Sequence, residues 1–542
     1  MVLIKNIDDI RNKSFDYIIV GGGTAGCVLA NRLSAQKHIE VLLLEAGTEV
    51  AQELEASRIP GLSGRLRKSE NEWCLRTTTQ DKINDRSLDV PLGKMLGGSS
   101  AMNATVLHRC SPSDYDAWQI KGWTYDDLQP YFEKAEKYHA SSASKVNGHG
   151  TNGPMHTSDV EVGPLGVPFR NACASLGLNF YEDMTLMRTQ IGVTNVHAMI
   201  HRGQRSSTSA SYMTAEVLER LNLTVALGCQ VQKIVIEKQR ATHVRFTLKG
   251  SQENLLVSAR REIIVCGGAI HSPHLLMLSG LGCARQLADH GIEAIRDLPG
   301  VGANLQNHWR VPFVHETTNP KQSLHGGLFR DPHSLVDAQN GKGALTRAWP
   351  DAVAYFNIPD CPSNSSHAAD APQFELFTGG IALCDLLPQL HDVDCATLLL
   401  VLLAPFSRGS VKLGPIVDPG LLQDERDVEC FHKGLQYVLQ IANDDAYKPN
   451  IKRWILAPTD DQSPHEYIRQ HIDSIHHYAG TCKMGHSDDP MAVVDAQLKV
   501  IGIEALRVVD ASIFPQVPAG QICFPVIACA EKAADVILNN VY

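Results

Sequence analysis

The sequence predicts an α/β protein with more than one lobe and a parallel sheet near its N-terminus. Residues 15–47 run through a short apolar segment, a glycine-rich turn, a helical segment and a second apolar segment. The chain has 542 residues, which is too long for one ordinary hydrophobic core. Between residue 311 and about residue 473, strand-like apolar runs such as residues 398–403 dominate. We therefore expect one lobe built on a parallel sheet and another rich in strands.

The segment at residues 15–47 has the pattern of a β-α-β unit. The apolar run that ends at Val20 suits a strand buried on both faces of a parallel sheet. Ala25, Leu29 and Leu33 follow at four-residue spacing, which places them on one face of a helix. A second apolar run ends at Glu45. This order of elements predicts two parallel strands joined by a helix.

The turn inside this unit reads Gly21-x-Gly23-x-x-Gly26, which predicts a dinucleotide site. The first glycine makes the tight turn, the second lets a pyrophosphate approach the backbone, and the third lets helix and strand pack closely. Glu45 stands about 20 residues beyond, where the fingerprint needs an acid for the ribose hydroxyls. A glycine pattern alone often marks an ordinary turn, but here both strands, the helix and the acid accompany it. The motif does not distinguish NAD from FAD.

Composition and charge exclude several classes of partner. The net charge is −10, and no block of Lys and Arg could serve a nucleic acid or an anionic membrane. The 14 cysteines are scattered without the spacing of a metal site, so we expect reduced thiols and no metal centre. No run approaches 18 apolar residues, and residues 1–10 lack the pattern of a secretory signal. We therefore expect a cytoplasmic protein without a membrane span.

Four further motifs give the sequence a family resemblance. Residues 93–104 contain Gly-Lys-Met-Leu-Gly-Gly-Ser-Ser-Ala-Met-Asn, and residues 268–282 form a second glycine-bounded motif. Residues 298–308 and 477–485 add two more, in the same order along the chain. Together with the fingerprint, these motifs resemble the glucose-methanol-choline (GMC) family of flavin oxidoreductases over nearly the whole chain.

The resemblance implies a bound FAD and a two-domain fold. A Rossmann-like FAD-binding domain would comprise residues 1–160, 200–310 and 482–542. A substrate-binding domain with a mainly antiparallel sheet would comprise residues 161–199 and 311–481. Substrate identity would depend on this second domain, where the family motifs are sparse.

The family's pattern also assigns cofactor-binding residues. The resemblance places residues 97–106, the flavin loop, beside the isoalloxazine ring. Some relatives attach the flavin covalently through a histidine just before the asparagine of this loop, where this chain has Met102, so the resemblance implies a non-covalent FAD. The residues that would bind FAD are Gly21, Gly23, Thr24, Ala25, Gly26, Glu45, Ala46, Gly98, Ser99, Asn103, Ala104, Val106, Val231, Asp510, Ala511 and Phe524.

A histidine is the expected catalytic base. An imidazole near its ordinary pKa suits removal of a hydroxyl proton at neutral pH. The family places this residue three positions before Gly-Thr-Cys, which is His477 here. His476 is its neighbour, and in a strand the two side chains would face opposite ways. We therefore expect His477 to be the base and His476 to face the other way, as a hydrogen-bonded or solvent-facing residue.

Gln521 departs from the family pattern. Relatives carry His or Asn at this second catalytic position, on the loop after the strand that ends in Asp510. Glutamine donates and accepts hydrogen bonds but does not titrate, and it is one methylene longer than asparagine. Either the substrate differs in shape, or the retained flavin serves a non-oxidative reaction. Some carboxylate-oxidising relatives place an arginine here, so its absence argues mildly against a small acid anion.

The resemblance favours oxidation of an alcohol to an aldehyde or ketone, with hydride transfer to flavin N5 and oxygen or another electron acceptor completing the cycle. The alternatives are a lyase or decarboxylase of the same fold, as in hydroxynitrile lyases, and a flavin-binding protein without catalysis. The substrate is a small molecule in the first two cases. The sequence does not indicate the oligomeric state.

Overall fold

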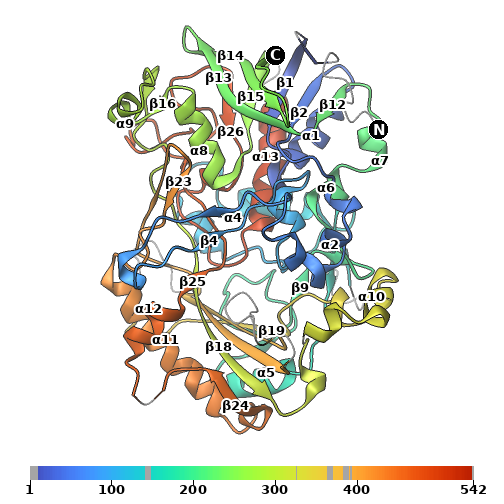
Figure 1. Ribbon diagram of the computed structural model, residues 1–542, viewed down its shortest axis with the longest axis vertical. Coiled ribbons are helices and arrows are strands. Elements are labelled where there is room, and N and C mark those ends of the chain that lie inside the picture. The colour runs from blue at the N-terminus through green and yellow to red at the C-terminus, as the bar shows by residue number, and fades with distance from the viewer. Residues whose placement is uncertain are drawn as a thin grey trace.

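The fold contains two large sheets at opposite ends of an elongated molecule (Figure 1). The structure is a computed structural model that describes residues 10–11, 13–140, 148–324, 326–362, 370–381, 390, 393–459 and 461–539. No helix in these ranges combines the length and hydrophobicity needed to cross a lipid bilayer.

The first sheet contains the predicted β-α-β unit. Its five parallel strands lie in the order β12 (Leu223–Ala226), β2 (Val41–Leu44), β1 (Ser14–Val20), β15 (Leu255–Val265) and β26 (Leu506–Val508). The antiparallel strands β13 (Cys229–Glu237) and β14 (Arg240–Leu248) extend from the N-terminal half of β15. The helix α1 (Thr24–Ser34) connects β1 to β2. This arrangement confirms the Rossmann-like part of the predicted fold.

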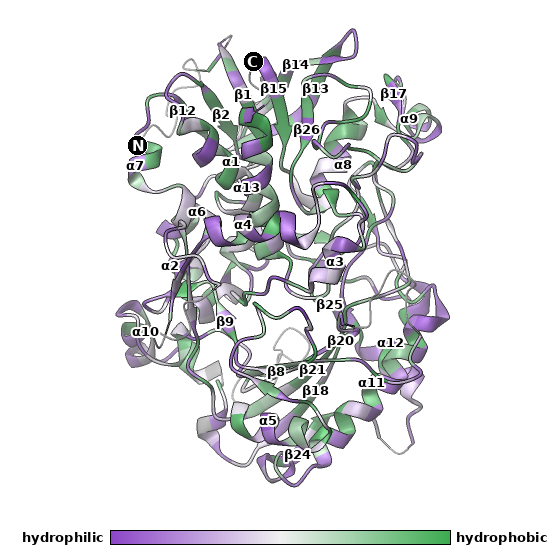
Figure 2. Ribbon diagram, turned by 180° about the vertical axis from the view of Figure 1, so that it is seen from behind, coloured by the Kyte–Doolittle hydropathy of each residue, from purple (hydrophilic) through white to green (hydrophobic). Residues whose placement is uncertain are grey.

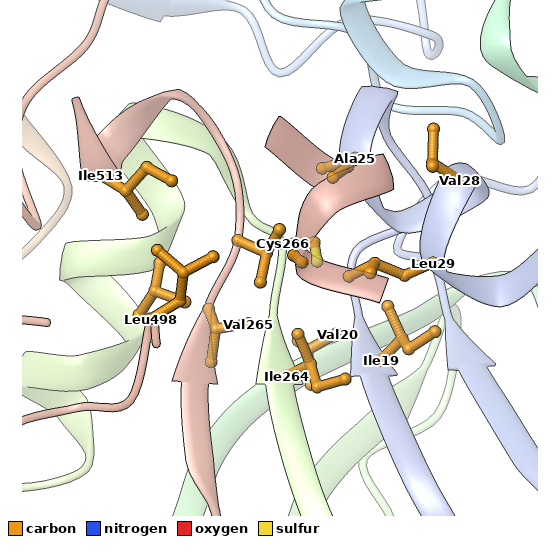
Figure 3. Packing of buried hydrophobic residues seen from close by; sticks show 14 of the residues in the cluster. Ile19, Val20, Ala25, Val28, Leu29, Ile264, Val265, Cys266, Leu498 and Ile513 are labelled. Atoms are coloured by element: carbon orange, nitrogen blue, oxygen red, sulfur yellow. The ribbon is translucent and has the colours of Figure 1, made fainter. Parts of the chain in front are cut away.

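Apolar packing fixes α1 against this sheet. Figure 3 shows Leu29 of α1 beside Ile19 of β1, and both side chains are fully buried. Burying one such side chain contributes about 1.5–3 kcal/mol. The C-terminal helix α13 (Cys523–Asn539) packs against α1 from a segment some 500 residues away in the sequence. The first turn of α1 is thereby held at the carboxyl edge of the parallel strands.

The second sheet is mainly antiparallel, as expected. Its main order is β24 (Ile451–Leu456), β18 (Trp309–Thr317), β21 (Cys395–Leu402), β20 (Phe374–Gly379), β19 (Ala352–Phe356), β8 (Gly192–Thr194) and β7 (Phe180–Tyr181), with β25 (Asp473–Ser474) also paired to β18. β7 and β8 form its one parallel pair among the described strands. Figure 2 shows hydrophobic residues along the strands of both sheets.

The two faces of the second sheet have different partners. Alternate residues such as Leu376 and Leu400 pack with α5 (Gly166–Ser175), α11 (Glu425–Asn443) and α12 (Pro464–His471) on the outer face. Their neighbours Phe377 and Leu399 form a separate cluster with Val106, from the predicted flavin loop. Because strand side chains alternate between faces, the inner face is turned toward the first lobe.

A small third sheet lies between the large ones. It consists of β5 (Glu136–His139), β6 (Met155–Asp159) and β9 (His197–Ala198), and β9 is visible near the middle of Figure 1. A hairpin follows directly, formed by β10 (Ile200–His201) and β11 (Gln204–Arg205). The domain boundaries predicted from the sequence stay a prediction, and residues 1–9 and 141–147 of the first range lie outside the described residues.

Candidate active site

A cavity of about 900 Å³ extends from the first turn of α1 to the inner face of the second sheet. This volume is in the range of small-molecule and cofactor sites. Every residue assigned to the site from the sequence lines it, except Gly26 and Phe524. The fold thus brings together residues separated by up to 500 positions in the sequence.

The glycine fingerprint forms one end of this cavity. A Cβ atom on Gly26 would lie 1.9 Å from the carbonyl oxygen of Gly21, so only glycine allows this approach of helix and strand. α1 begins at Thr24, directly after Gly23, and Thr24 lines the cavity. The unsatisfied N–H groups and the dipole of a helix N-terminus favour a phosphate. Gly26 thus has the packing role that the fingerprint requires of its third glycine.

Glu45 lies beside the fingerprint, and both of its carboxyl oxygens accept hydrogen bonds from backbone N–H groups. One carboxyl oxygen accepts from the N–H of Gly22 at 2.7 Å, and the other accepts from the N–H of Gly47 at 2.8 Å. Burial raises the pKa of Glu45 to about 7, and these hydrogen bonds partly oppose the shift. Glu45 and Ala46 line the cavity. The role of Glu45 in binding ribose hydroxyls stays a prediction.

The loop at residues 97–106 forms the middle of the cavity wall. Gly98 has a φ of +52°, and a Cβ atom there would lie 2.7 Å from the Cα of Gly23. Asn103 accepts through Oδ1 from the backbone N–H of Thr105 at 2.9 Å and from Nη1 of Arg205 at 2.7 Å. Sequence analysis missed Arg205, because its contact with this loop depends on the β10–β11 hairpin.

Asp510 organises the opposite wall. Its Oδ2 accepts from the N–H of Gly268 at 2.9 Å and from the Ser272 hydroxyl at 2.5 Å. Both donors belong to the first turns of α8 (Gly268–Leu278). Oδ1 accepts from the N–H of Ser512 at 2.8 Å. Asp510 therefore holds the N-terminus of α8 beside the cavity.

Phe524 lies in the core instead of the cavity wall. Its side chain is fully buried and packs on Phe132, with ring centroids 5.4 Å apart. The neighbouring residues Ile522, Cys523 and Val526 line the cavity. The cofactor-binding role of Phe524 stays a prediction.

His477 is half-buried and is held by hydrogen bonds on two sides. Its backbone N–H donates to Oδ1 of Asn307 at 2.7 Å, and its Nδ1 lies 2.9 Å from Nδ1 of His308. Burial lowers the pKa of His477 to about 4, and a hydrogen bond with the side chain of Gln521 partly opposes this shift. The imidazole is therefore neutral at pH 7 and able to accept a proton.

The expectation for His476 is wrong. The two histidines lie in an irregular segment instead of a strand, and both line the cavity. His476 has a φ of +68°, so the alternation of an extended chain does not apply to the pair. Burial, with repulsion by Arg310, keeps the pKa of His476 well below its ordinary value. His476 is thus a second neutral imidazole at the cavity.

Glu375 is a further acidic residue that sequence analysis missed. It is 0% exposed on β20, and both of its carboxyl oxygens accept from Nε2 of Gln521, at 3.1 and 3.0 Å. Burial raises the pKa of Glu375 to about 8, against hydrogen bonds from Tyr355 and Gln521 that lower it. The signal in the sequence was a single acid inside the apolar run Phe-Glu-Leu-Phe. Such an acid is unusual in a buried strand unless it has polar partners.

Apolar side chains dominate the part of the cavity next to the second sheet. The lining here comes from the flavin loop, the segment before β19, the inner face of the sheet and the segment before His476. It comprises Val106, Trp349, Phe377, Leu399 and Ile475. Trp349 and Phe377 have ring centroids 5.7 Å apart. A substrate that reaches His477 would therefore meet hydrocarbon and aromatic surface.

Comparisons with known proteins match this geometry. The family profiles of GMC oxidoreductases match residues 15–310 and 405–530. The dehydrogenase str4 of Strobilurus tenacellus is 33% identical, over 98% of this chain and 96% of its own. Alcohol dehydrogenase [acceptor] of Pseudomonas putida is also 33% identical, over 97% of this chain and 96% of its own.

A solved structure shows the same fold. Pyridoxine 4-oxidase from Mesorbium loti superposes with a TM-score of 0.85 at 31% identity, over 97% of this chain and all of that one. The glycine cradle, the helix N-terminus and the acid at one end of the cavity fit the FAD that this family binds. The chain belongs to the family of GMC oxidoreductases and is an FAD-dependent oxidoreductase.

Proposed function

We propose that this enzyme oxidises an uncharged alcohol to an aldehyde or ketone, with oxygen or another acceptor taking up the electrons. Bound FAD supplies the hydride acceptor. The observation that carries the proposal is the position of His477, a half-buried neutral imidazole that lines the cavity together with the glycine cradle.

His477 is the base that takes the hydroxyl proton. For Nε2 of His477 to accept this proton, the ring hydrogen of neutral His477 must be on Nδ1. This N–H then donates a hydrogen bond to Nδ1 of His308, 2.9 Å away. The hydrogen bond from the backbone of His477 to Asn307 fixes the position of the residue. Because burial lowers the pKa of His477 to about 4, the imidazolium formed during reaction needs support from its surroundings.

Gln521 and Glu375 provide that support. The amide nitrogen of Gln521 donates to Glu375, which leaves its carbonyl oxygen to accept a hydrogen bond from the protonated form of His477. Because burial raises the pKa of Glu375 to about 8, the ionised form that fixes this orientation of the amide and adds a negative charge behind it is present mainly above that pH. Where relatives have His or Asn, this chain therefore has a longer Gln whose amide nitrogen hydrogen-bonds the carboxyl group of Glu375 on β20. Glu375 acts as a positioning residue, through Gln521.

The cavity lining favours an apolar substrate. Trp349, Phe377 and Leu399 suit an aromatic or alkyl group next to the carbinol carbon. A quaternary ammonium substrate would meet the positive charge of Arg310, which lines the cavity, and Glu375 does not line it to offset that charge. We therefore favour benzylic or medium-chain aliphatic alcohols over choline or hydroxy acids.

The FAD is held without a covalent bond. Met102 lines the cavity at the loop position where some relatives have the attaching histidine, and a thioether does not form that bond. Acid precipitation should release all of the yellow chromophore into the supernatant. Flavin fluorescence that stays with the denatured protein would contradict the non-covalent assignment.

Anaerobic reduction of the flavin tests the reaction. The FAD-loaded protein is mixed in the dark with benzyl alcohol, 1-hexanol, choline or glycolate, and the visible flavin absorbance is followed. We expect the two uncharged alcohols to bleach the flavin at least tenfold faster than choline or glycolate, and air to restore the colour. An unreduced flavin with every alcohol, accompanied by turnover of a cyanohydrin or a fatty acid, would establish the non-oxidative alternative.

A further inference from the structure

Three histidines from different segments meet beside the small third sheet. His139 ends β5, His156 lies in the adjacent parallel strand β6, and His201 ends β10. Each offers one ring nitrogen, and these nitrogens all lie within 4.8 Å of one another. The Ser158 hydroxyl donates to the carbonyl oxygen of Ile200 at 2.8 Å, which ties β6 to β10. The fold therefore holds the three rings together through backbone elements.

The rings are in direct contact with one another. Nε2 of His139 and Nδ1 of His156 are 2.8 Å apart, and the His139 and His201 rings stack with centroids 3.9 Å apart. All three residues are half-buried. None of them lines the flavin cavity. The proposed oxidation reaction gives this cluster no role.

The three imidazoles are in the form that binds metals. A metal ion requires the neutral imidazole, which is the main form of an ordinary histidine at pH 7. Nitrogen ligands favour Zn²⁺, Cu²⁺ and Ni²⁺ over Mg²⁺ and Ca²⁺, which prefer oxygen.

We propose that His139, His156 and His201 form a binding site for a late first-row divalent metal, typified by Zn²⁺. Three histidine nitrogens leave a fourth tetrahedral position for water, which the half-exposed rings allow. The spacing of the cysteines predicted no metal centre. The three histidines are far apart in the sequence and come together only in the fold.

Binding requires small local adjustments. At a Zn–N distance of about 2.1 Å, two tetrahedral ligand atoms are roughly 3.4 Å apart. The His139 and His156 nitrogens must therefore separate by about half an ångström. Lys137 and Arg202 also lie close enough to lower the pKa of all three histidines. Both side chains are exposed, so they can turn toward solvent when the ion enters.

The site would have a structural consequence for the flavin loop. His201 lies in the hairpin that contains Arg205, and Arg205 is paired in register with Ile200. Arg205 donates to Asn103 of the flavin loop and, through Nε, to the carbonyl oxygen of Ser57 at 2.8 Å. An ion that joins β5 and β6 to His201 would rigidify the support of this loop.

Calorimetric titration of the metal-stripped, FAD-loaded enzyme with ZnCl₂ tests the proposal. We expect one equivalent to bind, and expect the affinity to fall at least tenfold in His156→Gln and in His201→Gln. The control is His290→Gln, because His290 is an exposed histidine on another part of the surface, and it should bind Zn²⁺ like the wild type.

Thermal unfolding provides a second measurement that does not depend on affinity fits. Zn²⁺ should raise the melting temperature of the wild type and of His290→Gln, but not that of His156→Gln or His201→Gln. Retained flavin absorbance shows that each variant is folded. The proposal is overturned if the wild type takes up no equivalent of Zn²⁺, or if the double variant His156→Gln/His201→Gln binds it as tightly as the wild type.

Discussion

Gln521 donates its side-chain amide to both carboxyl oxygens of Glu375, at 3.1 and 3.0 Å, across the junction between the C-terminal loop and the second sheet. The carboxyl group is completely buried, and burial raises its pKa to about 8. Gln521 also hydrogen-bonds His477. A titrating acid is thereby linked through a non-titrating amide to the proposed base, so ionisation of Glu375 should affect the proton transfer.

Replacing Glu375 by glutamine should change how the reaction depends on pH. In the wild type, the rate constant of flavin reduction should rise as His477 becomes neutral above pH 4 and rise again as Glu375 ionises around pH 8. The second rise follows because a negative charge near His477 stabilises the imidazolium. In Glu375→Gln we expect the second rise to vanish, so that reduction is about tenfold slower than wild type at pH 9 and within about twofold at pH 6. Stopped-flow reduction under anaerobic conditions measures both.

Glu216→Gln is the matched control, since Glu216 is an exposed acid on α7 (Ala215–Leu218) in the first lobe. It should keep the wild-type profile. If Glu375→Gln shows the same rise near pH 8 as the wild type, another group is responsible and the role of Glu375 as a positioning residue is lost.

The same substitution should alter the pH dependence of stability. Burial raises the pKa of folded Glu375 from 4.5 to about 8, so between these values the unfolded chain releases a proton that the folded chain retains. The stability from this group is therefore fully present below pH 4.5 and is lost as the pH rises toward 8, at up to about 1.4 kcal/mol per pH unit. Glutamine does not titrate. The free energy of unfolding of Glu375→Gln, relative to wild type, should rise steadily from pH 5 to pH 8 in urea denaturation. Parallel curves for the two proteins would show that the buried carboxyl group titrates normally.

The parts of the site that the sequence predicted are those built from local motifs. Gly21, Gly23 and Gly26 lie within six residues, and each has a role that the backbone geometry of one turn dictates. The order of strand, turn, helix and strand around them is also local. The β-α-β unit of the first lobe could therefore be predicted from residues 15–47, before any contact over longer distances was known.

The missed residues depend on pairings between distant segments. Glu375 meets Gln521 only because β20 lies between β19 and β21, an order that no short pattern encodes. The error at His476 has a different origin. The φ of +68° belongs to His476 itself, and with this backbone conformation neighbouring side chains do not point to opposite sides as they do in a strand. Arg205 was missed for the first reason, since its partner Asn103 lies about a hundred residues earlier.

Removing the imidazole of His477 should slow the reaction without loss of the cofactor. Proton transfer by a positioned side chain contributes about a hundredfold to ten-thousandfold, so His477→Ala should reduce its flavin more slowly by a factor in that range. The visible spectrum should show full FAD occupancy, because the glycine cradle and Glu45 are untouched. The exposed His38 serves as control, and His38→Ala should react like the wild type. An unchanged rate in His477→Ala would remove His477 from the role of base and direct attention to His476.

Gly98 should be required for FAD binding, because the flavin loop and the glycine fingerprint approach each other closely at this residue. A methyl group at this position would lie 2.7 Å from the Cα of Gly23, and the φ of +52° is unfavourable for alanine by about 1–2 kcal/mol. Gly98→Ala must therefore push the flavin loop away from the fingerprint, and we expect FAD affinity to fall at least tenfold. Gly64→Ala is the matched control, because Gly64 lines the same cavity and a Cβ atom there would meet nothing within 4 Å. The ratio of bound flavin to protein, with circular dichroism to confirm folding, distinguishes the variants. Equal occupancy in both would mean that the loop and the fingerprint do not form one cofactor site.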